Sequence, residues 1–300
     1  MKKLLVILGP TGVGKTDLSI EIANHLQCPI ISADSRQIYK GLIIGTDAPT
    51  KKQLQKVKHY FIGSLSIEDY FSASKFEEKT IKLLSELYRT HNNVIMTGGS
   101  MMYIDAVCKG IDDIPSIDPL LRKQLIEQYE KEGLDSIRMQ LKLRDPVFYD
   151  QVDLKNHKRV IHALEVCIMT GKPYSSFRKN TIKERPFEIV RIGLNRPREL
   201  LYERINARVD QMIENGLVEE ARVLYPYRHL NSLNTVGYKE LFKHFDGEWT
   251  LDFAVEKIKQ HSRNYARKQL SWFNRSKDIH WIDLTDQNID PKQIILSKIA

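Results

Sequence analysis

Several features of common protein classes are missing from this chain of 300 residues. Its three cysteines, Cys28, Cys108 and Cys167, are odd in number and have no Cys-x-x-Cys spacing, which argues against a disulfide framework and against a zinc site. No run approaches the roughly 20 apolar residues that a membrane span needs. No G-x-G-x-x-G fingerprint and no serine-nucleophile elbow is present. We therefore expect a soluble protein of the reducing cytoplasm with no membrane partner.

An excess of negative charge is also lacking. The net charge is +8 and the pI is near 9.2, while the hydrophobic and charged fractions of 42% and 28% are ordinary for a globular protein. A basic balance favours an acidic partner such as nucleic acid, but a generally basic cytosolic enzyme has the same balance. The length suits one large domain or one domain with an insertion.

One stretch near residue 10 carries a phosphate-binding pattern. G-x-x-x-x-G-K-[ST] is matched at every fixed position by the run Gly9, Pro10, Thr11, Gly12, Val13, Gly14, Lys15 and Thr16. Apolar residues at 4–8 predict a buried strand before this P-loop, and helical spacing over 17–23 predicts a helix after it. In such a loop the N–H groups converge on phosphate, Lys15 supplies a point charge and the Thr16 hydroxyl can hold magnesium. The pattern predicts a site for a diphosphate or a triphosphate without distinguishing them.

Asp34 is the first candidate for chemistry beside that loop. It follows a predicted strand at 29–33, and ligands of open α/β sheets bind outside the carboxyl ends of the strands, so Asp34 should face the same crevice. Its carboxylate could bind magnesium through water, cap a turn or act as a general base. Arg36 and Gln37 suit phosphate and base-edge contacts, although Arg36 could also be a solvated surface charge.

The chain is expected to hold two domains. A P-loop NTPase-like α/β core, with a parallel sheet flanked by helices, is predicted for 1–113 and 187–300, from strands at 4–8, 29–33, 93–97 and 188–194 and an edge strand at 279–284. Between 114 and 186, strand-like runs disappear and charged helices are predicted at 119–131, 134–143 and 156–169. We interpret 114–186 as an all-helical domain inserted into the core.

Two later helices carry candidate cations. In a helix predicted at 198–216, Arg204 and Arg208 lie one turn apart and could clamp phosphate, or could instead form ordinary pairs with Glu203 or Asp210 on a solvent face. The stretch 257–277 is basic and holds no acidic residue, which suits contacts with nucleic-acid phosphates. The seven-residue spacing of Ile258, Tyr265 and Trp272 predicts that these side chains lie mainly in the core.

Two alternatives remain open at this point. A nucleoside or small-molecule kinase of the P-loop type would share the loop and the arginines but would need ATP. A noncatalytic RNA-binding module with a vestigial loop would retain RNA without turnover. The usual partner of nucleotide-driven motors, an apolar strand ending in Asp-Glu, is absent from the sequence.

Nearly the whole chain resembles the bacterial tRNA isopentenyltransferase family, the tRNA dimethylallyltransferases. Beyond the P-loop, the resemblance is carried by Asp34-Ser35-Arg36-Gln37-Ile38-Tyr39, Gly98-Gly99-Ser100, Gly237-Tyr238-Lys239-Glu240 and Gln269-Leu270-Ser271-Trp272-Phe273. It implies transfer of a dimethylallyl group from dimethylallyl diphosphate to N6 of the adenosine 3′-adjacent to the tRNA anticodon. The products would be N6-isopentenyladenosine and diphosphate, and no nucleotide would be consumed.

The resemblance also implies residue roles. The P-loop would hold the diphosphate, with its charge neutralised by Lys15, by Arg208 and by Mg²⁺ on Thr16, while Asp34 takes the amine proton. The inserted helices would grip the anticodon stem. Contacts with the tRNA anticodon stem-loop are expected from Asp34, Ser35, Arg36, Gln37, Ser100, Arg122 and Arg159. Ser100 keeps the hydroxyl of the threonine that is usual in the family. We expect a monomer.

Overall fold

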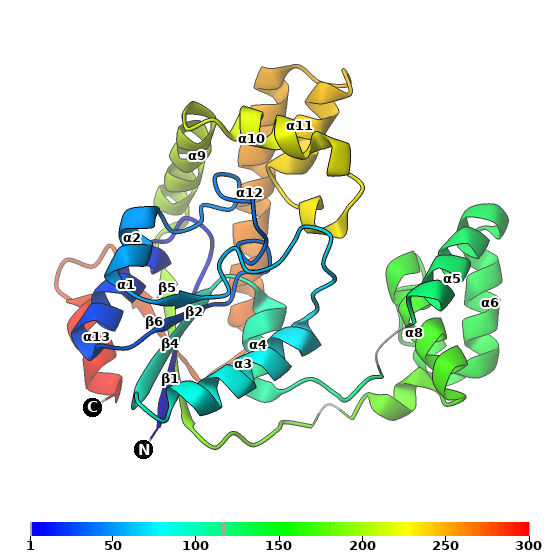
Figure 1. Ribbon diagram of the computed structural model, residues 1–300, viewed down its shortest axis with the longest axis horizontal. Coiled ribbons are helices and arrows are strands. Elements are labelled where there is room, and N and C mark those ends of the chain that lie inside the picture. Colours follow the sequence, from blue (N-terminus) through cyan, green and yellow to red (C-terminus); the bar gives the residue numbers. More distant parts are fainter. Residues whose placement is uncertain (1, 116–117, 180, 300) are drawn as a thin grey trace. The chain divides into compact units, whose positions relative to one another are not determined.

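The computed structural model describes residues 2–115, 118–179 and 181–299. Within these residues six strands form one parallel sheet in the order β3-β2-β4-β1-β5-β6 (Figure 1). The strands are β1 (Lys3–Leu8), β2 (Ile30–Ser32), β3 (His59–Tyr60), β4 (Asn93–Gly98), β5 (Glu188–Asn195) and β6 (Ile279–Asp283). Because all strands point the same way, their carboxyl ends meet at one edge, which is where a ligand crevice is expected.

The central strand β1 explains how the sheet is buried on both faces. It pairs with β4 from Lys3↔Asn93 to Leu8↔Gly98 and with β5 along its other side. Leu4, Val6 and Leu8 pack into one hydrophobic cluster, whereas Leu5 and Ile7 pack into another. Alternate side chains point to opposite faces, so an apolar residue at every position indicates helices on both sides. The predicted fold class is confirmed.

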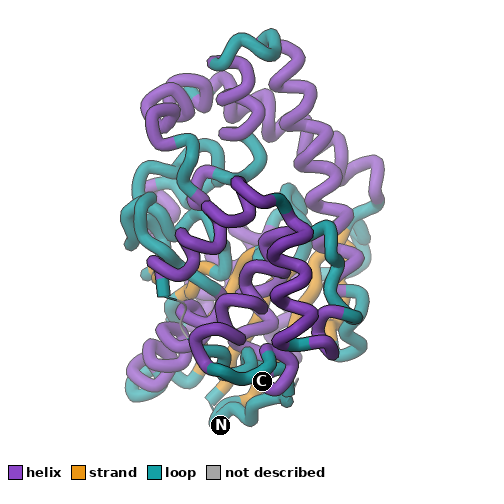
Figure 2. The backbone as a smooth tube through the Cα atoms, turned by 90° about the vertical axis from the view of Figure 1, so that its right-hand side faces the viewer, coloured by secondary structure: helices purple, strands orange, loops and turns teal. Residues whose placement is uncertain are grey.

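Helices cover the two faces in separate layers (Figures 1 and 2). One face packs against α1 (Lys15–Leu26), α9 (Arg198–Glu214) and α13 (Pro291–Ile299), and the other packs against α3 (Ala73–Leu87) and α4 (Met101–Lys109). The long helix α12 (Leu251–Phe273) joins three clusters, because Ile258, Ala266 and Phe273 each belong to a different one. The elements predicted from the sequence include the strands other than β3 but neither α4 nor α13.

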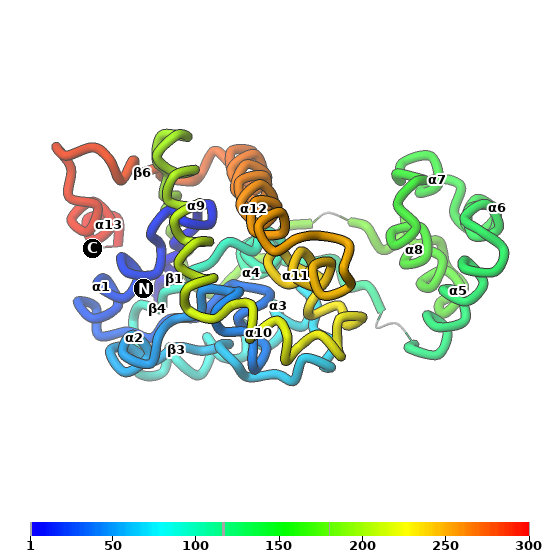
Figure 3. The backbone as a smooth tube through the Cα atoms, turned by 90° about the horizontal axis from the view of Figure 1, so that it is seen from above, coloured from blue at the N-terminus to red at the C-terminus, as the bar shows by residue number. Residues whose placement is uncertain are grey.

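A third cluster lies beyond the carboxyl edge of the sheet. It is built from α9, α12, α10 (Leu217–Leu224) and α11 (Tyr238–Phe245), together with Ile38 and Leu42 of the loop that follows β2. Figure 3 shows α9 and α12 rising side by side, with α10 and α11 next to them. Short elements complete this part of the chain: α2 (Lys51–Lys56) and two single turns of 3₁₀ helix, η2 (Tyr225–Tyr227) and η3 (Asn231–Leu233). These helices and turns position the loops that surround the site.

The chain separates into two compact units, 1–108 with 184–300 and 109–183. The second unit contains α5 (Pro119–Glu132), α6 (Leu134–Arg144), α7 (Pro146–Tyr149), α8 (His157–Thr170) and a 3₁₀ turn, η1 (Tyr174–Phe177). Its own core includes Leu125, Ile137, Leu141, Val160 and Leu164. Asp118 and Asn156 cap the first turns of α5 and α8. Across the described part of both units, no helix has the length and apolar character needed to cross a membrane.

Candidate active site

The P-loop connects β1 to α1 and has the backbone that its glycines predict. Gly9, Gly12 and Gly14 have φ values of 149°, 77° and 112°, which side chains of L residues rarely allow. A Cβ atom on Gly9 would also lie 2.6 Å from the carbonyl oxygen of Leu194. Glycine is therefore required here for both conformation and space, so the loop can curl tightly ahead of the helix N-terminus.

Lys15 is folded back onto this loop. Its Nζ donates hydrogen bonds to the carbonyl oxygens of Gly9, at 3.0 Å, and Pro10, at 2.7 Å. Burial of the ammonium and the nearby Arg208 cation lower the pKa of Lys15 to about 7, against opposing effects of Asp34 and Asp47. The loop gives the Lys15 ammonium only carbonyl dipoles as partners. A bound anion would give it a partner of opposite charge.

Arg204 and Arg208 of α9 both contact the P-loop. Arg208 donates to the Thr11 hydroxyl through Nη1, and its Nε lies 2.9 Å from Asp47 Oδ2 as an ion pair. Arg204 Nε donates to the carbonyl oxygen of Gly12 at 3.0 Å. Asp210, one of the partners that helical spacing offers these arginines, pairs with Lys259 at 2.8 Å instead. Arg208 is half-buried against the P-loop, whereas Arg204 is exposed, and the phosphate clamp predicted for them stays a prediction.

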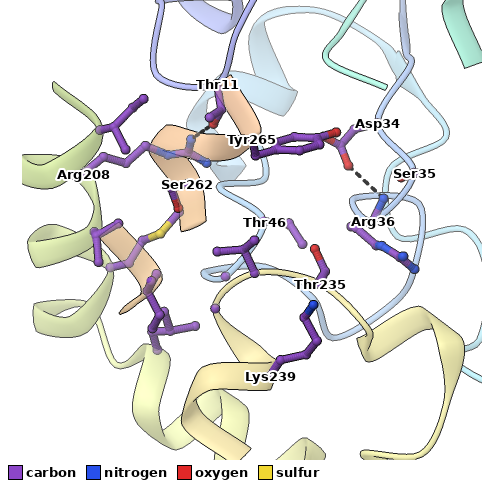
Figure 4. A pocket seen from close by; sticks show the side chains of 18 of the residues that line it. Thr11, Asp34, Ser35, Arg36, Thr46, Arg208, Thr235, Lys239, Ser262 and Tyr265 are labelled. Atoms are coloured by element: carbon purple, nitrogen blue, oxygen red, sulfur yellow. Dashed lines mark hydrogen bonds between the residues drawn. The ribbon is translucent and has the colours of Figure 1, made fainter. Parts of the chain in front are cut away.

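Asp34 begins the loop after β2 and faces the same crevice as the P-loop. Its Oδ1 accepts hydrogen bonds from the backbone N–H groups of Arg36, at 2.8 Å, and Gln37, at 3.1 Å, and so caps the turn. Within residues 2–115, 118–179 and 181–299 no hydrogen bond reaches Oδ2. Figure 4 shows the Asp34 carboxylate beside the ring of Tyr265. One oxygen thus orients the group, and the other is available to a ligand.

The two residues after Ser35 build the walls of the site. Arg36 Nη1 donates to the carbonyl oxygens of Asn231, at 2.8 Å, and Ser232, at 3.1 Å, so it is not a solvated surface charge. Gln37 Nε2 donates to the carbonyl oxygens of Thr46 and Asp47, both at 3.1 Å. These contacts fix two loops, and the role predicted for both side chains in tRNA binding stays a prediction.

The remaining predicted tRNA contacts lie in different places. Ser100 is buried at the start of α4, where its N–H donates to the Ala33 carbonyl oxygen at 3.2 Å. In the helical unit, Arg159 is exposed on α8, and Arg122 forms a bidentate ion pair with Glu165 at 2.7 and 2.8 Å. Burial alone would raise the pKa of Glu165, but hydrogen bonds from His162 and Arg122 lower it below its usual value. The half-buried Arg122 guanidinium thus pairs with Glu165, and the tRNA contact predicted for it stays a prediction.

Two adjoining cavities open among these residues. The first, of about 620 Å³, is lined by P-loop residues, Lys15 and Thr16 among them, and by Asp34. The second, of about 300 Å³, is lined by the apolar side chains of Ile205, Val209, Met212, Leu217 and Ile258. It is also lined by polar ones, among them Arg36, Thr235 and Lys239 (Figure 4). The two cavities share six lining residues: Thr11, Asp34, Thr46, Arg208, Met212 and Tyr265. A ligand with an anionic head and a short apolar tail fits this pair of cavities.

Gln269, for which the sequence pattern indicates no individual role, joins the P-loop to the glycine pair at the end of β4. Its buried Oε1 accepts from the Thr11 N–H at 2.9 Å, and its Nε2 donates to the Gly99 carbonyl oxygen at 2.9 Å. The prediction that Tyr265 lies mainly in the core was wrong, because that residue is 37% exposed and lines both cavities. The heptad spacing places Tyr265 on the face of α12 toward the cavity, which spacing alone cannot distinguish from the core.

Metal binding would have to use few protein ligands. Among the described residues, no three His, Cys, Asp or Glu side chains are grouped so that they could hold an ion. The Thr16 hydroxyl and the Asp34 carboxylate nevertheless line one cavity and are hard oxygen donors. Magnesium commonly takes one or two protein oxygens and completes its shell with phosphate oxygens and water. The donor set therefore fits magnesium only together with a phosphorylated ligand.

The parallel sheet carries a P-loop at its carboxyl edge, and this loop faces a carboxylate and a half-apolar cavity. These features define a phosphate-binding α/β protein with a site for group transfer. The model of the IPP transferase family matches residues 37–276, and the chain belongs to this family. The resemblance noted from the sequence is thereby confirmed.

Individual relatives agree with this assignment. The chain is 64% identical over 281 residues to tRNA dimethylallyltransferase 2 of Parabacteroides distasonis, covering 94% of each chain. It is 60% identical to tRNA dimethylallyltransferase 1 of Phocaeicola vulgatus, covering 98% of each. Among solved structures, the tRNA isopentenylpyrophosphate transferase of Bacillus halodurans has a TM-score of 0.71 at 34% identity, over 99% of this chain and 94% of that one. A eukaryotic dimethylallyltransferase described as acting on tRNA has a TM-score of 0.81 at 26% identity, over 96% and 75%.

Proposed function

We propose that this chain is a tRNA dimethylallyltransferase, which transfers a dimethylallyl group from dimethylallyl diphosphate to N6 of the adenosine 3′-adjacent to the anticodon. The single observation that carries the proposal is the joined pair of cavities, one lined by a P-loop and its cations and the other lined in part by apolar side chains. The names of the close relatives support the same reaction. A P-loop kinase is not favoured, because those relatives are prenyltransferases by name.

The donor would lie across both cavities. Its diphosphate would accept hydrogen bonds from P-loop N–H groups, with Lys15 and Arg208 facing the negative charge that grows as the carbon–oxygen bond breaks. The five-carbon group would pack against apolar residues such as Val209 and Met212. A leaving group held this way departs as diphosphate, so the reaction would consume no nucleoside triphosphate.

The acceptor adenine would approach Asp34 from the side opposite the dimethylallyl diphosphate. An adenine amine is a weak nucleophile, so its placement against the allylic carbon matters as much as its basicity. As the N6–carbon bond forms and the carbon–oxygen bond breaks, the amine proton would pass to the Asp34 carboxylate, whose Oδ1 is already oriented by two backbone N–H groups. The adenosine must leave the stack of the anticodon loop to reach this position, as in other enzymes that act on a base.

Magnesium would be held by the Thr16 hydroxyl together with diphosphate oxygens. When bound, it would neutralise charge on the leaving group. The tRNA would be recognised by Asp34, Ser35, Arg36, Gln37 and Ser100 in the sheet unit. Arg122 and Arg159 are proposed as contacts from the helical unit with the anticodon stem.

A transfer assay without nucleotide tests the proposal. The protein is incubated with magnesium, radiolabelled dimethylallyl diphosphate and unmodified tRNA, with ATP omitted, and label in the tRNA is measured after nuclease digestion. We expect labelled N6-isopentenyladenosine and one diphosphate released for each group transferred. Phosphorylation of a small molecule only when ATP is supplied would instead identify a kinase, and RNA retention without turnover would identify a binding module.

A further inference from the structure

A carboxylate outside the two cavities holds one wall of the site in place. Glu220, on α10, accepts three consecutive backbone N–H groups from the loop after β2: Ile43 at 3.1 Å, Ile44 at 2.8 Å and Gly45 at 2.9 Å. Hydrogen bonds to an ionised acceptor are roughly twice as strong as neutral ones.

Tyr238 completes this anchor from α11. Its hydroxyl donates to Glu220 Oε1 at 2.7 Å, and the residue is fully buried. Burial and the adjacent Glu220 carboxylate keep the pKa of Tyr238 above its usual value, so the phenol remains a donor. A Cβ atom on Gly45 would lie 2.6 Å from the Tyr238 ring, so the loop and the ring are in close contact. Glu220 therefore ties the loop to both α10 and α11.

The loop held in this way leads directly to the clamp arginine. Two residues after Gly45, Asp47 has a φ of 52°, a left-handed conformation that few residues other than glycine adopt. Its backbone is held by Ile44 and Gln37, and its carboxylate lies 2.9 Å from Arg208 Nε. The Asp47 carboxylate attracts the Nε side of Arg208 by charge, although no described residue accepts a hydrogen bond from Nε, while Nη1 donates to Thr11 of the P-loop. The orientation of Arg208 thus depends on where the loop places Asp47.

We propose that Glu220 is a positioning residue, which fixes residues 43–47 so that Asp47 aims Arg208 at the diphosphate. The inference deepens the proposed function, on which it rests for the identity of the diphosphate ligand. Glu220 touches neither substrate in this arrangement. Glu220 acts through Asp47. Removal of the Glu220 carboxylate should therefore weaken diphosphate binding only while the Asp47 carboxylate is present.

Binding of inorganic diphosphate tests this link without requiring turnover. Glu220→Gln replaces one acceptor oxygen by an NH₂ group that would face a donor. Titration calorimetry with magnesium and inorganic diphosphate should give a fivefold to tenfold larger Kd than for the unchanged protein. Glu219→Gln is the matched control, because Glu219 lies on the same helix, is largely exposed and pairs only distantly with Arg222 at 3.8 Å. That variant should change the Kd by less than twofold.

The deciding measurement repeats Glu220→Gln in an Asp47→Asn background. If Glu220 acts through Asp47, the substitution should there change the Kd by less than twofold. An equal loss in both backgrounds would overturn the proposal, and so would an unchanged Kd in the single variant. Should Glu220→Gln fail to fold, Tyr238→Phe removes one hydrogen bond from the same carboxylate, and we expect a twofold to threefold larger Kd only when Asp47 is intact.

The transfer assay separates this inference from the proposed function. For Glu220→Gln, kcat/KM for dimethylallyl diphosphate should fall by the same factor as diphosphate binding, while KM for tRNA is unchanged. A higher KM for tRNA alone would contradict the inference. If the unchanged protein modified no tRNA, the proposed function would fail, yet the diphosphate titrations would still decide the role of Glu220.

Discussion

The lowered pKa of Lys15 predicts that diphosphate binding depends on pH in a way that the ligand alone does not explain. Burial and the Arg208 cation lower this pKa from 10.5 to about 7, so the ammonium is charged below pH 7 and neutral above it. A bound diphosphate would stabilise the charged form and restore the pKa toward its ordinary value. Affinity should therefore be highest below pH 7 and should fall as the pH rises through 7.

The size of the effect follows from that pKa. One pH unit above it, about nine tenths of the lysines are neutral, and protonating them on binding costs about 1.4 kcal/mol. The Kd should accordingly rise about tenfold between pH 6 and pH 8, and binding at pH 8 should take up about 0.9 proton per diphosphate. Calorimetry in two buffers of different ionisation enthalpy measures this uptake directly.

Lys15→Arg provides the control, because a guanidinium stays charged throughout this range. The ionisation of diphosphate itself is common to both proteins and cancels in the comparison. We expect the variant to lack the additional proton uptake. Equal uptake by the two proteins, or no uptake by the unchanged one, would refute the titration assigned to Lys15.

Three further substitutions test other parts of the structure. Asp34→Asn should leave the Kd for tRNA within about threefold and lower turnover by about 10²- to 10³-fold, as single-turnover rates would measure. Equal losses of tRNA binding and of turnover would assign Asp34 a structural role. Gln269→Leu leaves the Thr11 N–H and the Gly99 carbonyl oxygen without these partners. Denaturant unfolding should then report a free energy of unfolding lower by about 2–4 kcal/mol, and a decrease below about 1 kcal/mol would contradict that role. Arg122→Ala leaves the buried Glu165 carboxylate with only the more distant His162 as a partner, at a cost of up to about 3–5 kcal/mol in the helical unit. Adding Glu165→Gln should restore most of that stability, and failure to do so would show that the pair is not the cause.

The strands and long helices could be predicted because their residue patterns are local. β1 is apolar at nearly every position, and α12 has buried residues at helical spacing over most of its length. β3 has only two residues, too few for any period to appear. The helical spacing of Tyr103, Ile104, Val107 and Cys108 does indicate α4, and this local signal was overlooked.

The residues of the site were also predictable where the sequence pattern is local and not where distant parts of the chain meet. The P-loop residues and Asp34 were found because a motif and the strand ends place them together. The contacts that complete the site join distant parts of the chain: Gln269 reaches Thr11 across 258 positions, and Glu220 reaches the loop at Gly45 across 175. The sequence left the orientation of Arg208 open, because a charge beside the buried stripe of a helix can turn either way. The position of the Asp47 carboxylate beside Arg208 Nε decides it, and that position depends on a loop far away in the sequence.

The central claim is that a P-loop holds a departing diphosphate while Asp34 receives the proton of an extruded adenine. A crystal structure with magnesium, diphosphate and an unmodified anticodon stem-loop would test this most directly. We expect the adenine N6 atom within about 3 Å of the Asp34 carboxylate, with diphosphate on the P-loop. An adenine amine far from Asp34, or a diphosphate bound elsewhere, would contradict the account.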